Sequence, residues 1–333
     1  MFRKKIDQLK RYSAFATGDF ERIFSGLEPP PCPEVVTAVL KAMDDPDIGI
    51  EDIQKILESD AALSAKILSV ANSALYGARS RISSISKAIS MLGLQEIGAI
   101  TLGYALVKAT ADPSRTGFDM KSYWSDTLTR AIFAKKISRL TGMGSPEEAF
   151  SGALFQDIAL PVILKQWFDT YERVFNTWLR EKQPLAVIEN RILKWTHGEA
   201  GAWIAGRWEL PDILVCAIGL HEGPLSKIEE LHLMDSAIPP VVLSSMIPSI
   251  LLWNNTISET VNGKEEEIDP FWNDQIRRLV KGARELEVSL PRLADVLEET
   301  VDSVEDLALA LGVKVADTEL HKHTLEAVAE IKQ

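Results

Sequence analysis

The side chains that could do chemistry in this sequence are a few carboxylates and histidines that lie far apart along the chain. Asp157 stands inside the apolar run 153–163, His197 follows a threonine, and His221 directly precedes Glu222. A carboxylate in apolar surroundings is costly to bury without a partner. Imidazole and carboxylate groups together can bind a transition metal. The residue types therefore predict either a metal site or a structural hydrogen-bond network between helices, and they leave both interpretations open.

Local signals indicate that each of these residues lies at a helix end. Pro161 follows Asp157 by four residues, so a helix through Asp157 must end or bend there. The Thr-His-Gly-Glu sequence at 196–199 is a capping box that places His197 in the first turn of a helix, where the dipole favours a neutral imidazole. His221 precedes Glu-Gly-Pro at a helix C-terminus, where the dipole favours protonation.

Other signals of enzymatic chemistry are absent from the sequence. It contains no G-x-G-x-x-G, Walker loop, nucleophile elbow or H-E-x-x-H motif. The remaining histidines, His232, His321 and His323, lie in polar segments that we expect to be solvated, and we assign them no role. Cys32 and Cys216 are far apart and lack metal-site spacing, which favours a reducing compartment, with Cys216 as a small core residue.

The elements that must position these side chains are helices. Apolar residues recur at helical spacing through nearly the whole chain, for example at Trp124, Leu128 and Ile132. No segment shows the strict alternation of a half-buried strand followed by a hairpin turn. The sequence therefore predicts an all-α fold.

Several helix ends can be predicted from single residues. Asp60 and Ser84 are expected N-caps, and Ser145, followed by proline and two glutamates, begins another capped helix. Gly93 and Gly142 are expected C-terminal stops. The proline-rich segment 29–33 is expected to be an extended strap, and 111–117 a linker between two helical groups.

The charge of the chain is concentrated in its last third. The formal net charge is -12, and residues 225–333 carry 10 basic and 21 acidic side chains, against 26 and 27 in the residues before them. Nucleic-acid binding needs a positive surface, so we expect no nucleic-acid partner, even though residues 82–98 have the pattern of a helix-turn-helix. The acidic region, which includes an amphipathic helix predicted at 290–311, is expected to select partners electrostatically.

Nothing in the sequence indicates a membrane protein. The basic N-terminus is not followed by an apolar stretch, so it is not a signal peptide. The most apolar run, 238–253, is interrupted by three prolines and is shorter than the ~20 residues that span a bilayer. We therefore expect a soluble, cytoplasmic protein.

Short motifs in a fixed order carry a family resemblance. The first half of the chain contains Asp-x-x-Leu at 60–63, Asn-Ser-x-x-Tyr-Gly at 72–77 and Ala-x-x-x-Leu-Gly at 88–93. The second half contains Pro-Glu-Glu-Ala-Phe at 146–150, the run 152–158, His197, Trp-Glu-Leu-Pro at 208–211 and His-Glu-Gly-Pro at 221–224. Together these motifs resemble an HDOD domain, a bacterial output domain related to the HD phosphohydrolases.

The resemblance implies a domain organisation and a fold. We expect an HDOD-like domain over 1–225, made of an N-terminal helical half (20–110) and a degenerate HD-like half (118–225), followed by an acidic helical region over 226–333. The fold would be an HD-like multi-helix bundle with an added helical subdomain. Asn72 and Tyr76 invite a ligand-binding interpretation, but Asn before Gly is common at helix ends, which favours a helix stop for Asn72 and packing between the halves for Tyr76.

The resemblance also implies what a working site would need. In an active HD hydrolase a first histidine, a His-Asp pair, further histidines and a last aspartate hold one or two metals. Here aspartate replaces the first histidine, glutamine replaces the paired one, glutamate replaces one of a later pair, and no aspartate occurs between 236 and 268. The residues at these positions form the expected vestigial cluster: Asp126, Gln156, Asp157, His197, His221 and Glu222.

The expected function follows from that loss. We predict a non-catalytic bacterial signal-transduction protein that binds other signalling proteins, with a small ligand and a homo-oligomer left open. We expect no cofactor and no resident metal, and Asp157, His197 and His221 are the residues that could retain one. The alternative is a phosphohydrolase with an altered metal site that acts on a nucleotide or cyclic dinucleotide.

Overall fold

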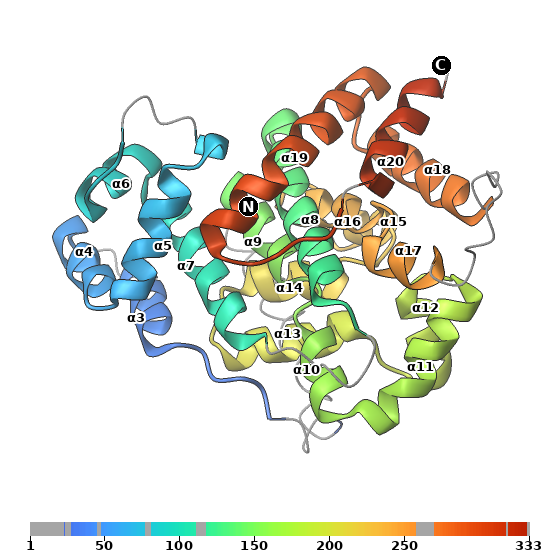
Figure 1. Cartoon of the computed structure of the whole chain (residues 1–333), viewed down its shortest axis with the longest axis horizontal. Helices are drawn as coiled ribbons and strands as arrows, with labels where there is room; N and C mark the ends of the chain where they lie inside the picture. The colour runs from blue at the N-terminus through green and yellow to red at the C-terminus, as the bar shows by residue number, and fades with distance from the viewer. Residues whose placement is uncertain are drawn as a thin grey trace.

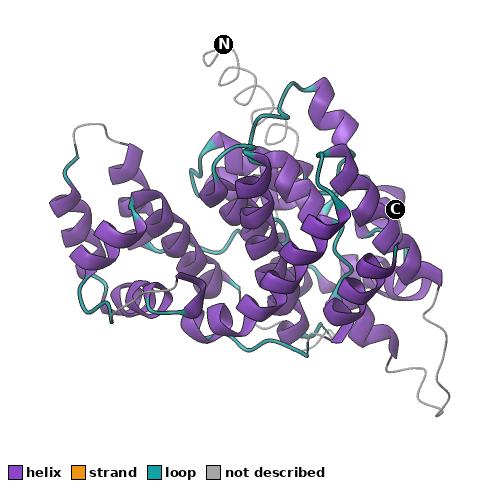
Figure 2. Cartoon of the chain, turned by 90° about the horizontal axis from the view of Figure 1, so that it is seen from above, coloured by secondary structure: helices purple, strands orange, loops and turns teal. Residues whose placement is uncertain are grey.

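The computed structural model describes residues 23, 28–44, 48–76, 81–110, 118–257, 270–317 and 319–331. Every regular element within these ranges is a helix, as Figure 2 shows, which confirms the predicted all-α fold. The linker predicted at 111–117 lies outside the described residues, as does Gly77 of the Asn-Ser-x-x-Tyr-Gly motif.

The N-terminal helices form a lobe of their own at the left of Figure 1, and α7 connects this lobe to the rest of the chain. The predicted caps are confirmed, because the Asp60 and Ser84 side chains accept the amide hydrogens of the third residues of α5 and α6. No single described helix is long and apolar enough to cross a bilayer; only α6 and α7 taken together reach that length, and they meet at a bend of 116°. The elements are α3 (Glu34–Asp44), α4 (Ile50–Glu58), α5 (Ala61–Ala71), η1 (Ala74–Tyr76), α6 (Ile85–Leu92) and α7 (Leu94–Ala109).

The second group of helices surrounds α8, which is buried along most of its length. Gly142 ends α8 in the left-handed conformation that glycine favours, with φ 71°, as predicted. The chain breaks between α9 and α10 at residues 156–158, where Pro161 predicted a break. Cys216 is fully buried in α14, and burial raises its pKa to about 12. The elements are α8 (Met120–Thr141), α9 (Pro146–Phe155), α10 (Ala159–Gln166), α11 (Phe168–Glu181), α12 (Leu185–Ile192), α13 (His197–Arg207) and α14 (Asp212–Leu220).

The C-terminal helices pack back onto α8, and Figure 1 shows α19 lying across it. The Ala316 amide donates to the Ser125 hydroxyl at 2.8 Å, and Lys136 pairs with Glu299 at 2.6 Å. The amphipathic helix predicted at 290–311 is confirmed as α19. The elements are α15 (Leu225–Glu230), α16 (Ile238–Ser245), α17 (Ile250–Ile257), α18 (Pro270–Glu285), α19 (Leu290–Leu311) and α20 (Glu319–Glu330).

A buried ion pair joins the N-terminal lobe to α8. The side chains of Glu96 on α7 and Lys135 on α8 are each only 4% exposed, and they contact each other directly. The Tyr76 hydroxyl donates to the same carboxylate, and its ring lies 5.0 Å from the Lys135 ammonium. Asn72 ends α5, and its side chain binds the backbone of Ile82. Asn72 therefore ends a helix and Tyr76 packs between the two halves, as the sequence favoured.

Candidate functional site

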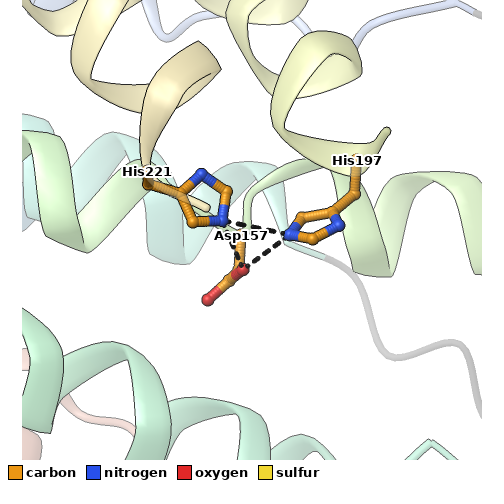
Figure 3. Close-up of side chains that lie close together, drawn as sticks. All are labelled: Asp157, His197 and His221. Atoms are coloured by element: carbon orange, nitrogen blue, oxygen red, sulfur yellow. Dashed lines mark hydrogen bonds and ion pairs between the residues drawn. The ribbon is translucent and has the colours of Figure 1, made fainter. Parts of the chain in front are cut away.

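Three of the predicted site residues converge where α9, α13 and α14 meet. Asp157 lies in the turn before α10, His197 is the first residue of α13, and His221 is the C-cap of α14. The Nε2 atoms of the two histidines are 3.1 Å apart, and they lie 3.2 Å and 3.6 Å from Asp157 Oδ1, as drawn in Figure 3. All three residues are at most 5% exposed. The fold thus brings together residues that are up to 64 positions apart in the sequence.

Hydrogen bonds at the far side of each imidazole fix how the rings are protonated. His221 Nδ1 lies 2.7 Å from the Ile218 carbonyl, which can only accept, so Nδ1 carries the hydrogen and a neutral His221 presents a lone pair at Nε2. His197 Nδ1 lies 2.8 Å from a Glu189 carboxylate oxygen and donates to it. With a second proton at Nε2, His197 donates to the lone pair of His221.

The charge states of the two histidines are the reverse of those predicted from the helix dipoles. Burial opposes a charge on His197, but the carboxylates of Glu189, Glu222 and Asp157 outweigh it and raise its pKa well above the ordinary value. Burial lowers the pKa of His221 to about 4, so this ring is neutral at pH 7. The prediction failed for His197 because a fractional charge at a helix end is weaker than a full carboxylate at hydrogen-bond distance, and for His221 because burial outweighs the helix end.

An arginine with no role predicted from the sequence balances the charge of Asp157. Arg130 Nη1 lies 2.5 Å from Asp157 Oδ2, and the arginine side chain is only 12% exposed. Burial opposes ionisation of Asp157, but Arg130 and the two histidines hold its pKa far below the usual range. Arginine stays protonated at any physiological pH, so this positive charge is permanent.

Asp126, predicted as a member of the cluster, binds elsewhere. Its carboxylate accepts from the Ser249 hydroxyl at 2.6 Å and from the amides of Ile250 and Leu251 at 2.7 Å and 3.2 Å. These are the first free amides of α17, so the carboxylate supports the start of that helix. Burial raises the pKa of Asp126, although Arg130 and these hydrogen bonds oppose the rise.

Gln156 and Glu222 lie at the edge of the cluster. Gln156 is fully buried, and its amide donates to Asp157 Oδ2 at 3.3 Å and accepts from Ser244 at 3.4 Å. The Glu222 side chain, 26% exposed, lies 3.9 Å from His197 Nδ1, and burial raises its pKa to about 7. Gln156 therefore supports Asp157 through a neutral hydrogen bond.

Two buried residues that the sequence did not point to complete the network. Glu189, on α12, is fully buried and receives bonds from the His197 ring, the His197 amide and the Tyr171 hydroxyl. Arg130 had a weak sequence signal, because it follows Asp126 by one helical turn, at the spacing of an ion pair on a helix. Glu189 had none, since its role depends on contacts between different helices.

The position of His321 differs from the one predicted. It was predicted to be solvated, but it is 2% exposed on α20, with Nδ1 3.4 Å from the Thr129 hydroxyl. Burial, with Arg130 acting in the same direction, lowers its pKa to about 3. His323, two residues later, has a side chain that is 41% exposed. Amphipathic helices place such close neighbours on different faces, which a polar composition does not reveal.

The Asp157, His197 and His221 side chains have the chemistry of a metal-binding set. Two imidazoles and one carboxylate present one ligand atom each, all within 4.8 Å of one another. The far nitrogens of both rings are held by a carboxylate and a carbonyl, as is usual for metal-binding histidines. Two features compete with a metal: the permanent charge of Arg130 on Asp157, and the proton that the surrounding carboxylates stabilise on His197. The residues thus fit one ion in competition with protons and arginine.

A cavity of about 410 Å³ opens beside the cluster. Asp157, His197 and Glu222 line one side of it, and side chains of α18 line another. Its volume is in the range of sites for small organic molecules.

This all-helical architecture, with a histidine–aspartate cluster buried between three helices, defines an HD-related helical domain. The model of the HDOD domain family matches residues 30–224, more than half of the chain, and the chain belongs to this family. The resemblance found in the sequence is thereby confirmed.

Individual relatives agree with this assignment. An uncharacterized protein of Treponema pallidum (strain Nichols) is 24% identical over 195 residues, which cover 58% of this chain and only 37% of that protein. The crystal structure of an HDOD domain protein of unknown function from Geobacter sulfurreducens matches with a TM-score of 0.61 at 21% identity, over 96% of this chain and 99% of that one. A protein from Shewanella amazonensis SB2B, provisionally named a phosphohydrolase, matches with a TM-score of 0.64 at 20% identity, over 85% and 94%. At these identities the structures establish the fold alone.

Proposed function

We propose that this HDOD protein is a non-catalytic signalling protein that acts by binding other proteins. The observation that carries the proposal is the buried ion pair between Arg130 and Asp157. A guanidinium at this carboxylate supplies the positive charge that a metal would supply in a hydrolase, but it cannot activate a water molecule as a Lewis acid.

The fate of the other cluster positions supports the same proposal. The Asp126 carboxylate is committed to the start of α17, and Gln156 offers only a neutral amide. Amide oxygen is a weak ligand for a transition metal compared with imidazole. These two positions therefore contribute to folding, and the ligand character of the cluster remains with Asp157, His197, His221 and Glu222.

The test of this proposal is a hydrolysis assay on metal-loaded protein. The purified protein is incubated with Mn²⁺ or Fe²⁺ and with bis(p-nitrophenyl) phosphate, beside the Asp157→Ala variant. We expect equal background rates for both proteins. Metal-dependent turnover by the wild type that Asp157→Ala abolishes would establish the hydrolase instead.

The acidic outer face of α19 is the surface that we propose for a protein partner. Asp295, Glu298, Asp302 and Glu305 are all exposed and lie on one side of this helix. Their spacing of three to four residues forms a continuous negative stripe, which complements a basic partner surface. The partner we propose is therefore a signalling protein with a basic face.

The partner surface is tested by reversing its charge. Glu298→Lys together with Asp302→Lys inverts the middle of the stripe, and Glu172→Lys, at an exposed site on α11, is the matched control. In cross-linking experiments in the source bacterium, we expect a specific set of proteins to be captured by the wild type and by the control, and lost with the double variant. Equal capture by all three would contradict the proposed surface.

The second candidate is a phosphohydrolase with an altered site, favoured by the convergence of Asp157, His197 and His221. These three residues would hold the ion, and a bound ion would supply an activated water. The chain's own contribution would be to orient both rings through Glu189 and the Ile218 carbonyl. The hydrolysis assay separates this candidate from the first.

A further inference from the structure

The cavity beside the cluster has the composition of a ligand site. It lies between α8, α12 and α16–α18, and α18 is outside the segment that matches the family. Aromatic side chains, among them Trp178 and Trp272, form part of its wall and are themselves largely buried. Concave sites of this size, with apolar and aromatic walls and polar groups between them, are typical of small-molecule binding.

One buried polar group on the cavity wall has no hydrogen bond of ordinary geometry. Tyr123 is 2% exposed and lines the cavity, and its hydroxyl is unsatisfied. The Thr127 hydroxyl, one turn further along α8, is close enough to influence the Tyr123 pKa but is also unsatisfied. Buried hydroxyl groups are nearly always paired, because an unpaired one keeps the full cost of its desolvation. A ligand in the cavity would supply the missing acceptor.

Three cationic side chains line the cavity and keep N–H donors that are available to a ligand. Arg130 donates to Asp157 through one nitrogen. Because a guanidinium carries five N–H donors, others remain available to a ligand. Arg278 lines the cavity from α18 and takes part in no ion pair with a residue that the structure describes. Lys281, three residues further on, pairs with Glu285 only at 3.8 Å.

The acidic groups on the wall are mostly committed to partners. The Asp157 carboxylate is bound by Arg130, and that of Asp126 by the start of α17. Glu222 lies 3.9 Å from the His197 ring. A negatively charged ligand would therefore find N–H donors on Arg130 and Arg278, and the Asp126 and Asp157 carboxylates beside it are already bound by protein donors.

We propose that this cavity binds a small organic anion, with a carboxylate or phosphate head group facing the guanidinium groups of Arg130 and Arg278. The apolar body of the anion packs against Trp178 and Trp272, and the Tyr123 hydroxyl donates to the ligand. The inference rests on the proposed function in one respect, because the anion is held and not cleaved. Since α18 closes the cavity, the ligand also contacts the region that carries most of the negative charge of the chain.

The proposal is tested with small probes of known charge on the full-length protein. Phenyl phosphate and benzoate represent the two head groups, benzyl alcohol is the neutral control, and inorganic phosphate lacks the apolar body. Binding is followed by calorimetry and by tryptophan fluorescence. We expect at least one aromatic anion to bind about tenfold or more tightly than benzyl alcohol and inorganic phosphate. The preferred anion identifies the head group. Equal binding of the neutral control, or no binding of either anion, would overturn the proposal.

Matched variants locate the binding to this cavity. Arg278→Gln removes a cavity-lining charge, and Arg277→Gln removes the exposed charge beside it on α18 that does not line the cavity. We expect the first to weaken binding of the preferred anion by about fivefold or more and the second to leave it unchanged. Equal losses would mean that the anion responds only to general surface charge, which would overturn the assignment.

Tyr123→Phe gives an independent readout. Because its hydroxyl makes no hydrogen bond of ordinary geometry within the protein, its removal should leave the melting temperature unchanged or higher while weakening the binding of the anion. A lower melting temperature with unchanged anion affinity would show a structural hydroxyl and contradict the proposed contact. Release of phenol from phenyl phosphate would contradict the proposed function and leave binding intact, so the two failures are distinguishable.

Discussion

The Arg130–Asp157 ion pair can be tested by a double-mutant cycle. Arg130→Met keeps an unbranched apolar stem but removes the guanidinium, and so leaves Asp157, whose side chain is 7% exposed, without its main counter-charge. Removing one partner of a buried pair costs about 3–5 kcal/mol of the free energy of unfolding. Asp157→Asn leaves Arg130 still attracted by Asp126, so we expect a smaller cost of about 2 kcal/mol. The double variant avoids the unpaired charge and should recover about 2 kcal/mol of the summed loss.

The cycle is measured by urea denaturation at pH 7 with EDTA present and absent. A coupling energy below about 0.5 kcal/mol would refute the reasoning, because independent sites add within that margin. EDTA should not change the unfolding midpoint of the wild type. A large drop with EDTA would mean that a bound metal, and not Arg130, balances the carboxylate.

Three further predictions concern buried charge and backbone conformation. The pKa of His321 is about 3 in the folded protein, which is below its unfolded value, so stability should fall as the pH drops from about 6.5 toward 3. His321→Asn should flatten this slope by up to ~1.4 kcal/mol per pH unit. The exposed control His323→Asn should leave the slope unchanged when both variants are followed by urea denaturation. Lys135→Met leaves the buried Glu96 carboxylate without its counter-charge and should lower the free energy of unfolding by about 3 kcal/mol. Part of this loss should be recovered when Glu96 is neutralised as well. Gly144→Ala should lower stability by at least about 2 kcal/mol, because φ is +65° and the added carbon would lie 2.2 Å from a backbone nitrogen, whereas Gly142→Ala, with open space around it, should cost about 1 kcal/mol. Thermal melts of the two glycine variants compare them directly.

The helix ends were predictable from the sequence because their causes are local. Asp60 and Ser145 accept amide hydrogens two or three residues away, and Thr196 and Glu199 form the reciprocal capping box that their spacing predicts. Gly142 adopts the left-handed conformation that its position required. In each case the deciding atoms lie within one helical turn, so spacing along the chain is equivalent to distance in space.

The charge states in the site were not predictable, because their causes are distant in sequence. His197 owes its raised pKa first to Glu189, eight residues upstream on another helix, and to groups from other parts of the chain. Asp157 owes its lowered pKa first to Arg130, 27 residues away. Long-range contacts of this kind depend on the packing of complete helices, and helical periodicity sets which face is buried but not which partner it meets.

The contact of the C-terminal helices with α8 limits how this protein can be shortened. The matched family segment ends at residue 224, yet Asp126 and Ser125 on α8 use partners from beyond that point, and Thr129 faces His321. A chain cut at residue 225 would expose apolar surface and leave a buried carboxylate without its donors, so it should be degraded or aggregate when expressed. The segment that the family model matches is therefore shorter than the unit that folds, and a tag or fusion partner should not be placed at its boundary.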